Sequence, residues 1–232
     1  LHYLCRKMEG YAQVLGLDGS GWKAFGGRLA PVKTNEKGLP LFDGIDVFAS
    51  HRHFCHLFPI YPLCEEAHNE VAQRSLDTAI NQGFLEFAAF SCPYLGIMAS
   101  RCGRGNMART MLESSDAFTL ESGFFVPTAL CEMFVHRALD TVWLLMGMPD
   151  EWKSAGCSGL TVEGGHKVTI DMEDYRISRV KLTAGCEETI TLRWKGDNPV
   201  KRILKNGVEE EGCGFTELML PLRMQDEWVI EF

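Results

Sequence analysis

The stretch MGMPDEW, residues 146–152, divides the chain into two parts with different hydrophobic periods. Before it, apolar residues recur about every 3.6 positions, which is typical of helices that bury one face. After it they alternate with polar residues, as in KVTIDME at residues 167–173, which is typical of half-buried strands. We therefore expect a helical segment over residues 1–148 and a β domain over residues 149–232.

The helical part contains several segments with helical spacing. These are residues 4–15, 71–80, 87–98, 106–112 and 125–139. The third segment is apolar on nearly all sides, which predicts a helix buried between others and either started or interrupted at Pro93. Between the first two segments lies a long loop, residues 33–62, and loops of that length in a compact domain usually carry function.

In the β part, Asn206-Gly207 is a strong hairpin signal, and Gly164-Gly165 marks another tight turn. Together with the alternating strands, these turns predict a small antiparallel β-sandwich. The apolar stretch VWLLMGMPDEW should dock this domain against the helices, because its large side chains are costly to leave in water.

Composition excludes several classes of protein. The 232 residues are 46% hydrophobic, enough for a substantial core, but no apolar run reaches the ~18 residues of a membrane span. The formal net charge is -8 and the Lys and Arg residues are scattered, which disfavours nucleic acid as a partner. The nine cysteines are an odd number without a C-x-x-C pair, so they predict no disulfide framework. Cys131, among apolar neighbours, is expected to be a small buried hydrophobe.

The stretch SHRHFCHLFPIYP, residues 50–62, concentrates titratable groups and is open to three interpretations. His51 and His53 have the spacing of a strand that presents two imidazoles to zinc, but no second ligand pair from a separate turn accompanies them, so we expect no metal. Arg and His side chains beside aromatic rings also suit a polyhydroxylated ligand. The third interpretation is a buried loop whose histidines bond backbone carbonyls.

A second candidate is Glu121, which follows the apolar AFTL and precedes the helical segment FFVPTALCEMF. A carboxylate at a turn into a helix is commonly a cap or a first-turn acid, because the helix dipole favours negative charge there. A catalytic carboxylate could occupy the same position.

These two segments, in this order and followed by a β tail, resemble glycoside hydrolase family 95, which contains the α-1,2-L-fucosidases, in the six-hairpin glycosidase clan. The family's H-R-H-L-S-H-L-Y-G-L-Y-P is similar to residues 51–62, and its F-Q-I-D-G-N-F-G is similar to residues 118–125. The resemblance implies a multidomain α and β protein, with part of an (α/α)6 toroid followed by a small antiparallel β-sandwich. Residues 1–148 would form the C-terminal half of the barrel, and the upstream half of the same barrel is the expected partner.

The resemblance also implies hydrolysis of a glycosidic bond with inversion, by a carboxylate acid/base mechanism without a cofactor. Arg52, His53 and His51 would contact the hydroxyls of an oligosaccharide or glycan, and His56 would brace the loop. Glu121 would be the base-side carboxylate, while nothing in residues 1–50 is similar to the family's general acid.

The chain departs from the family at three places: Glu121 replaces an aspartate, Ser122-Gly123 replaces G-N, and FAAFSCPYLG replaces a W-S-R-A-W-like helix. Because nothing in residues 1–50 is similar to the general acid, the resemblance implies that the chain taken alone offers one side of a catalytic site. The alternative function is a non-catalytic carbohydrate-binding or scaffold relative. The family resemblance implies a periplasmic or extracellular location.

Overall fold

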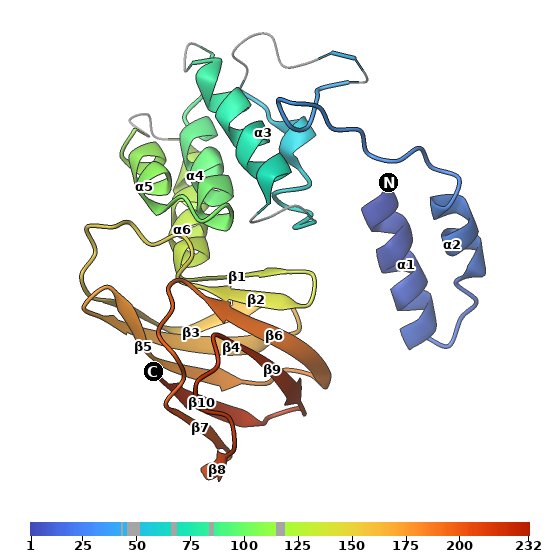
Figure 1. Cartoon of the computed structure of the whole chain (residues 1–232). Helices are drawn as coiled ribbons and strands as arrows, with labels where there is room; N and C mark the ends of the chain where they lie inside the picture. Colours follow the sequence, from blue (N-terminus) through green and yellow to red (C-terminus); the bar gives the residue numbers. More distant parts are fainter. Residues whose placement is uncertain (43, 46–51, 66–68, 84–85, 115–118) are drawn as a thin grey trace.

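The computed structural model describes residues 1–42, 44–45, 52–65, 69–83, 86–114 and 119–232. These residues combine helices with two β-sheets, so the protein has a mixed α and β architecture (Figure 1). The helices are α1 (His2–Val14), α2 (Ser20–Gly26), the 3-10 helix η1 (Cys55–Leu57), α3 (Glu70–Asn81), α4 (Ser91–Arg101), α5 (Gly105–Glu113) and α6 (Leu120–Phe134). The strands are β1 (Val135–Ala138), β2 (Thr141–Leu144), β3 (Ala155–Val162), β4 (His166–Glu173), β5 (Arg176–Thr183), β6 (Glu188–Trp194), β7 (Arg202–Lys205), β8 (Val208–Glu210), β9 (Glu217–Leu222) and β10 (Glu227–Glu231).

The helices α1, α3, α4 and α5 lie where hydrophobic spacing predicts them. The side chain of Asn69 caps α3 by accepting a hydrogen bond from the backbone N–H of Ala72 at 2.8 Å. Every residue of α4 is buried, as its all-round apolar sequence predicts. Pro93 lies in the first turn of α4, where its missing N–H has no intrahelical partner to lose, so it starts the helix and does not interrupt it.

The end of α6 differs from the expectation. The predicted helix to Leu139 is wrong, because the chain becomes extended at Val135 and forms β1, which pairs with β2. Leu139 then adopts a left-handed conformation (φ 56°) in the β1–β2 turn. The change from helix to strand therefore occurs at Val135. The hydrophobic pattern predicts it later, near Pro149. Cys131, expected to be buried, is exposed on α6, and all nine cysteines are free.

The strands form a four-stranded sheet in the order β1-β2-β6-β9 and a six-stranded sheet in the order β3-β4-β5-β10-β7-β8. The expectation of purely antiparallel strands is wrong for one pair, since β2 and β6 run parallel with Thr141 opposite Thr191. No hairpin joins these two strands, so no tight turn forces them to run in opposite directions. The predicted Asn206-Gly207 hairpin joins β7 to β8, with positive φ angles of 51° and 80°.

A single core runs from the sandwich into the helices. Alternate residues of β4 and β6 are buried between the two sheets, and the rings of Trp194 and Phe232 meet edge to face at 4.8 Å. The core continues through Leu144 and Leu145, which are buried in the apolar stretch that leaves β2. There Gly105 lies so close to the Met148 carbonyl that an added Cβ would be 2.1 Å from the oxygen. This close packing docks α4, α5 and α6 onto the sandwich (Figure 1).

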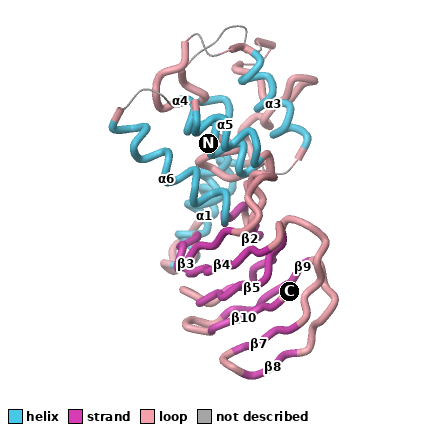
Figure 2. The backbone as a smooth tube through the Cα atoms, turned by 90° about the vertical axis from the view of Figure 1, so that its left-hand side faces the viewer, coloured by secondary structure: helices cyan, strands magenta, loops and turns pink. Residues whose placement is uncertain are grey.

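The first two helices form a separate hairpin beside the rest of the chain (Figure 1), although α1 overlaps the other helices in the view of Figure 2. They pack closely where Cys5 of α1 faces Gly26 of α2. Arg6 forms an ion pair with Glu65, and Lys7 pairs with Glu163 at 2.5 Å, which ties α1 to the loop after η1 and to the β3–β4 turn. No helix among the described residues is long and apolar enough to cross a membrane.

Candidate functional site

The segment from Arg52 to Tyr61 is docked on α4. Ser91 at the start of α4 donates from Oγ to the Arg52 carbonyl at 3.2 Å, and the Tyr94 hydroxyl donates to the Tyr61 carbonyl at 3.0 Å. Between these two bonds the ring of Phe54, only 4% exposed, packs against Tyr94 with centroids 6.2 Å apart. These contacts thus hold the segment in place against α4.

The side chains of Arg52 and His53 are exposed at this end of the helices. The Arg52 Nε donates to His53 Nε2 at 3.3 Å, so the two side chains lie side by side. A guanidinium and an imidazole held together in this way offer several donors to a ligand in solvent. His51 lies outside the described residues.

His56, in η1, has a different environment. It is half-buried, and neither ring nitrogen has a hydrogen-bond partner among the described residues. Burial lowers its pKa to about 4, so the ring is neutral at physiological pH. His56 therefore bonds no backbone carbonyl of the described residues, unlike the histidines of the buried-loop interpretation. Its role in bracing the loop remains a prediction.

Aromatic rings connect the Arg52–His53 pair to α6. The His53 ring lies 5.5 Å from that of Phe90, and Phe90 lies 6.4 Å from Phe125, measured between centroids. Phe125 is four residues after Glu121 on α6, and residues four apart share one face of a helix. The structure therefore brings the loop segment and the first turn of α6 to the same end of the helices.

Glu121 lies in that first turn, and it is not the helix cap. Thr119 holds the cap position, where its Oγ1 accepts from the Ser122 backbone N–H at 3.2 Å. The carboxylate of Glu121 is exposed and forms no hydrogen bond or ion pair with another described residue. Its remaining structural role is a favourable interaction with the helix dipole, which is small for exposed groups.

Sequence reasoning missed Phe90 and Phe125, the rings that join the two candidate segments. The spacing of Phe125 from Glu121 could have indicated it, because both lie on one helix face. Phe90 has no such signal, since its role depends on α4 lying between the loop and α6.

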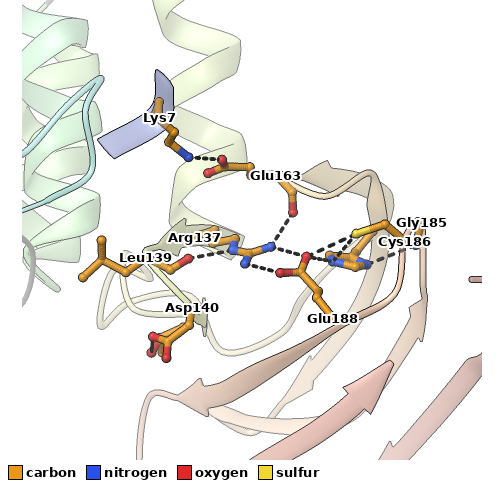
Figure 3. Close-up of polar contacts among 10 residues, drawn as sticks. Lys7, Arg137, Leu139, Asp140, Glu163, Gly185, Cys186 and Glu188 are labelled. Carbon is orange, nitrogen blue, oxygen red and sulfur yellow. Dashed lines mark hydrogen bonds and ion pairs between the residues drawn. The ribbon is translucent and has the colours of Figure 1, made fainter. Parts of the chain in front are cut away.

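A second polar cluster lies in the sandwich, where Arg137 of β1 meets Glu188 of β6 (Figure 3). Arg137 donates from Nη1 and Nη2 to the two oxygens of Glu188, both at 2.7 Å. The His166 Nε2 lies 2.6 Å from Glu188 Oε1, and the Cys186 Sγ lies 3.4 Å from the same oxygen. The hydrogen bonds from Arg137, assisted by His166, lower the pKa of Glu188 to about 2 despite its partial burial.

His166, Cys186 and Glu188 are types of residue that bind zinc, and their ligand atoms lie within 4.8 Å of one another. The hydrogen bonds argue against a metal, however. The backbone N–H of Gly185 donates to His166 Nδ1 at 3.1 Å, so Nε2 carries the ring proton and donates it to Glu188. Burial and the neighbouring carboxylate raise the pKa of the Cys186 thiol, which keeps it protonated. We interpret the cluster as a satisfied network that joins the two sheets.

A third polar cluster lies at the C-terminal end of α6. Arg101 of α4 pairs with Glu132 at 2.9 Å, and their side chains are only 5% and 14% exposed. Arg101 also donates to the carbonyl of Arg137 at 3.0 Å and lies over the ring of Tyr61. Burial raises the pKa of Glu132, while the positive charge of Arg101 acts in the opposite direction. No feature of the sequence distinguishes Glu132 as a buried carboxylate.

Comparison with known proteins gives little beyond this geometry. No known family matches the sequence, and no curated protein matches it significantly. Among solved structures, the chain is similar to Ara127N, a GH127 β-L-arabinofuranosidase from Geobacillus stearothermophilus T6, at 11% identity and a TM-score of 0.28. The similarity covers 100% of this chain and 41% of that chain, so this chain spans less than half the length of the enzyme. That neighbour is a glycoside hydrolase.

Proposed function

We propose that this chain is part of a glycoside hydrolase of the six-hairpin type. In this proposal residues 1–148 belong to the C-terminal half of an (α/α)6 toroid, residues 149–232 form its C-terminal β-sandwich domain, and the upstream half of the barrel completes the ring. The observation that supports it most is the placement of Arg52, His53 and Glu121 at one end of the helices, connected by aromatic rings.

The proposed substrate is a glycan. Arg52 and His53 supply planar N–H donors for sugar hydroxyls, and the nearby ring of Phe90 can cover sugar C–H groups. His51 would add a third contact of the same kind. The family resemblance makes an α-L-fucoside the first candidate sugar.

In the proposed mechanism the bond is cleaved with inversion. Glu121 acts on the base side, where its carboxylate helps a water molecule attack the anomeric carbon. The general acid, on the upstream half, protonates the leaving oxygen from the opposite face. Inverting enzymes hold the two carboxyl groups roughly 6.5 to 9.5 Å apart to leave room for that water. An exposed first-turn carboxylate that pairs with no described residue is available for this role.

The test is a kinetic comparison in the full-length protein that contains this chain. Glu121→Gln should lower kcat by about 10² to 10⁴ on aryl glycosides with little change in KM, because the group acts mainly in the transition state. Glu113→Gln, which changes an exposed glutamate on α5, is the matched control and should leave kcat unchanged. The 232-residue chain alone should not hydrolyse the same glycosides, since it lacks the acid. Equal kcat in Glu121→Gln and the unchanged protein would reject the catalytic role.

A non-catalytic carbohydrate-binding relative is the second candidate function. It would use the same exposed Arg52 and His53 contacts but would show no turnover. In that case the full-length protein should hydrolyse no glycoside. His53→Ala should weaken its glycan binding and leave its melting temperature nearly unchanged.

A further inference from the structure

A pocket of about 270 Å³ lies beside the six-stranded sheet, lined mostly by the segment that joins β2 to β3. Its walls come from the segment that joins β2 to β3, from the β4–β5 turn and from Lys195 just after β6. The N–H of Leu145 in this segment donates to the carbonyl of Phe134 at 2.7 Å, so the pocket lies near the C-terminal end of α6. Glu121 lies at the N-terminal end of α6. An α-helix rises 1.5 Å per residue, so Glu121 is about 20 Å from Phe134 along the helix axis.

Tyr175, on the wall of this pocket, has an unusual backbone conformation. Asp174 and Tyr175 have φ angles of 48° and 66°, the left-handed pair of a two-residue hairpin turn. The β7–β8 hairpin fills the same two positions with Asn206-Gly207, the usual residues. A tyrosine is strained in this conformation, because its Cβ crowds the backbone, whereas glycine adopts it freely.

Packing does not account for the tyrosine either, because Tyr175 is 60% exposed. Its backbone N–H donates to the carbonyl of Lys153 at 2.9 Å, which holds the turn against the joining segment. A strained conformation that places a large ring in solvent suggests a functional role for that ring.

The other walls supply complementary chemistry. Trp152 presents a second, partly buried aromatic side chain. Lys195 donates from Nζ to the Met148 carbonyl at 2.8 Å and lies 3.4 Å from Asp150 Oδ1. Asn106 donates to Asp150 Oδ2 at 2.9 Å, so the charged groups are held in place although both are exposed. A lysine ammonium has three hydrogen-bond donors, and a carboxylate has several acceptor positions. Lys195 and Asp150 can therefore form further hydrogen bonds with a ligand.

We propose that this pocket binds one polyhydroxylated ring, a monosaccharide or a terminal sugar residue of a glycan. Aromatic side chains cover the C–H face of such a ring, while Lys195 and Asp150 bond its hydroxyls. The volume is just below the roughly 300 to 1,000 Å³ of small-molecule sites, so it suits one ring and excludes an oligosaccharide chain. The choice of a sugar agrees with the proposed function, but the pocket is remote from Glu121 and would bind without hydrolysis.

The test is a titration of the full-length protein with single sugars, namely L-fucose, L-arabinose, D-galactose and D-glucose. Binding is followed by tryptophan fluorescence and by saturation-transfer NMR, and Trp152→Phe should remove the fluorescence response but not the NMR signal. Tyr175→Gly should weaken binding about fivefold to tenfold, as expected for loss of one aromatic contact. This variant also relieves the backbone strain, so its melting temperature should be equal or higher and a loss of binding cannot be attributed to unfolding.

Tyr11→Ala, which removes another exposed tyrosine on α1, is the matched control and should bind sugar normally. Equal affinity in Tyr175→Gly and the unchanged protein, or no saturable signal with any of the four sugars, would overturn the proposal. Glu121→Gln should retain this binding, so a lost activity with retained binding separates the pocket from the proposed catalytic site.

Discussion

The two ends of α6 carry the same type of side chain in opposite environments. At the N-terminal end Glu121 is exposed, and no described residue pairs with it. At the C-terminal end Glu132 is nearly buried and bonded to Arg101, next to the sandwich. The difference shows that burial and partners, and not residue type, decide whether a carboxylate on this helix is available for chemistry or holds the structure together.

The loop segment on α4 repeats this contrast with histidines. His53 is exposed beside Arg52, whereas His56 three residues later is half-buried and neutral. Glu121 and His53 are therefore accessible to a ligand. The states of Glu132 and His56 depend on the side chains packed around them. The following predictions test whether this division holds.

The largest effect is expected at Glu132. Glu132→Ala leaves the Arg101 guanidinium buried without its counter-charge, which should cost about 3 to 5 kcal/mol of unfolding free energy. Urea unfolding followed by circular dichroism measures the loss. A loss under about 1 kcal/mol would mean that the two ends of α6 do not differ as the structure indicates.

The next largest loss of stability is expected at Gly105, where α5 contacts the segment that follows β2. Gly105→Ala places a Cβ 2.1 Å from the Met148 carbonyl oxygen and should destabilise by about 1 to 3 kcal/mol, because backbone must move. Gly10→Ala is the control, since Gly10 lies inside α1 with no atom within 4 Å of the added Cβ. That control should stabilise by about 0.5 to 1 kcal/mol through helix propensity. Equal effects of the two changes in urea unfolding would argue against tight docking of the helices on the sandwich.

A smaller, pH-dependent effect is expected at His56. Its pKa in the folded protein, about 4, lies below the ordinary 6.5, so the unfolded chain takes up the proton first as the pH falls. Stability from this residue is therefore full above about pH 6.5 and declines between 6.5 and 4, by up to about 3 kcal/mol. His56→Leu should flatten the curve of unfolding free energy against pH in this range. An unaltered curve in His56→Leu would contradict the assignment of a buried, neutral ring.

The smallest effect on stability is expected at Glu121. Glu121→Ala should change the unfolding free energy by less than about 0.5 kcal/mol, since the Thr119 cap remains and the side chain is exposed. Measured beside Glu132→Ala in the same buffer, it gives the contrast between the ends of α6 directly. A loss comparable to that of Glu132→Ala would show that Glu121 has a structural role.

Local patterns in the sequence determined α1, α3, α4 and α5, the Asn206-Gly207 hairpin and the alternation in β4, because each depends on residues close together in the chain. They also singled out, separately, the two segments that contain Arg52, His53 and Glu121. The tertiary structure alone decided the rest: α6 stops at Phe134 because β2 is available to pair with the following residues, and β2 runs parallel to β6 because distant strands meet there. Glu132 is nearly buried and Cys131 exposed for a similar reason, since adjacent positions on one helix face different neighbours once the sandwich packs against it.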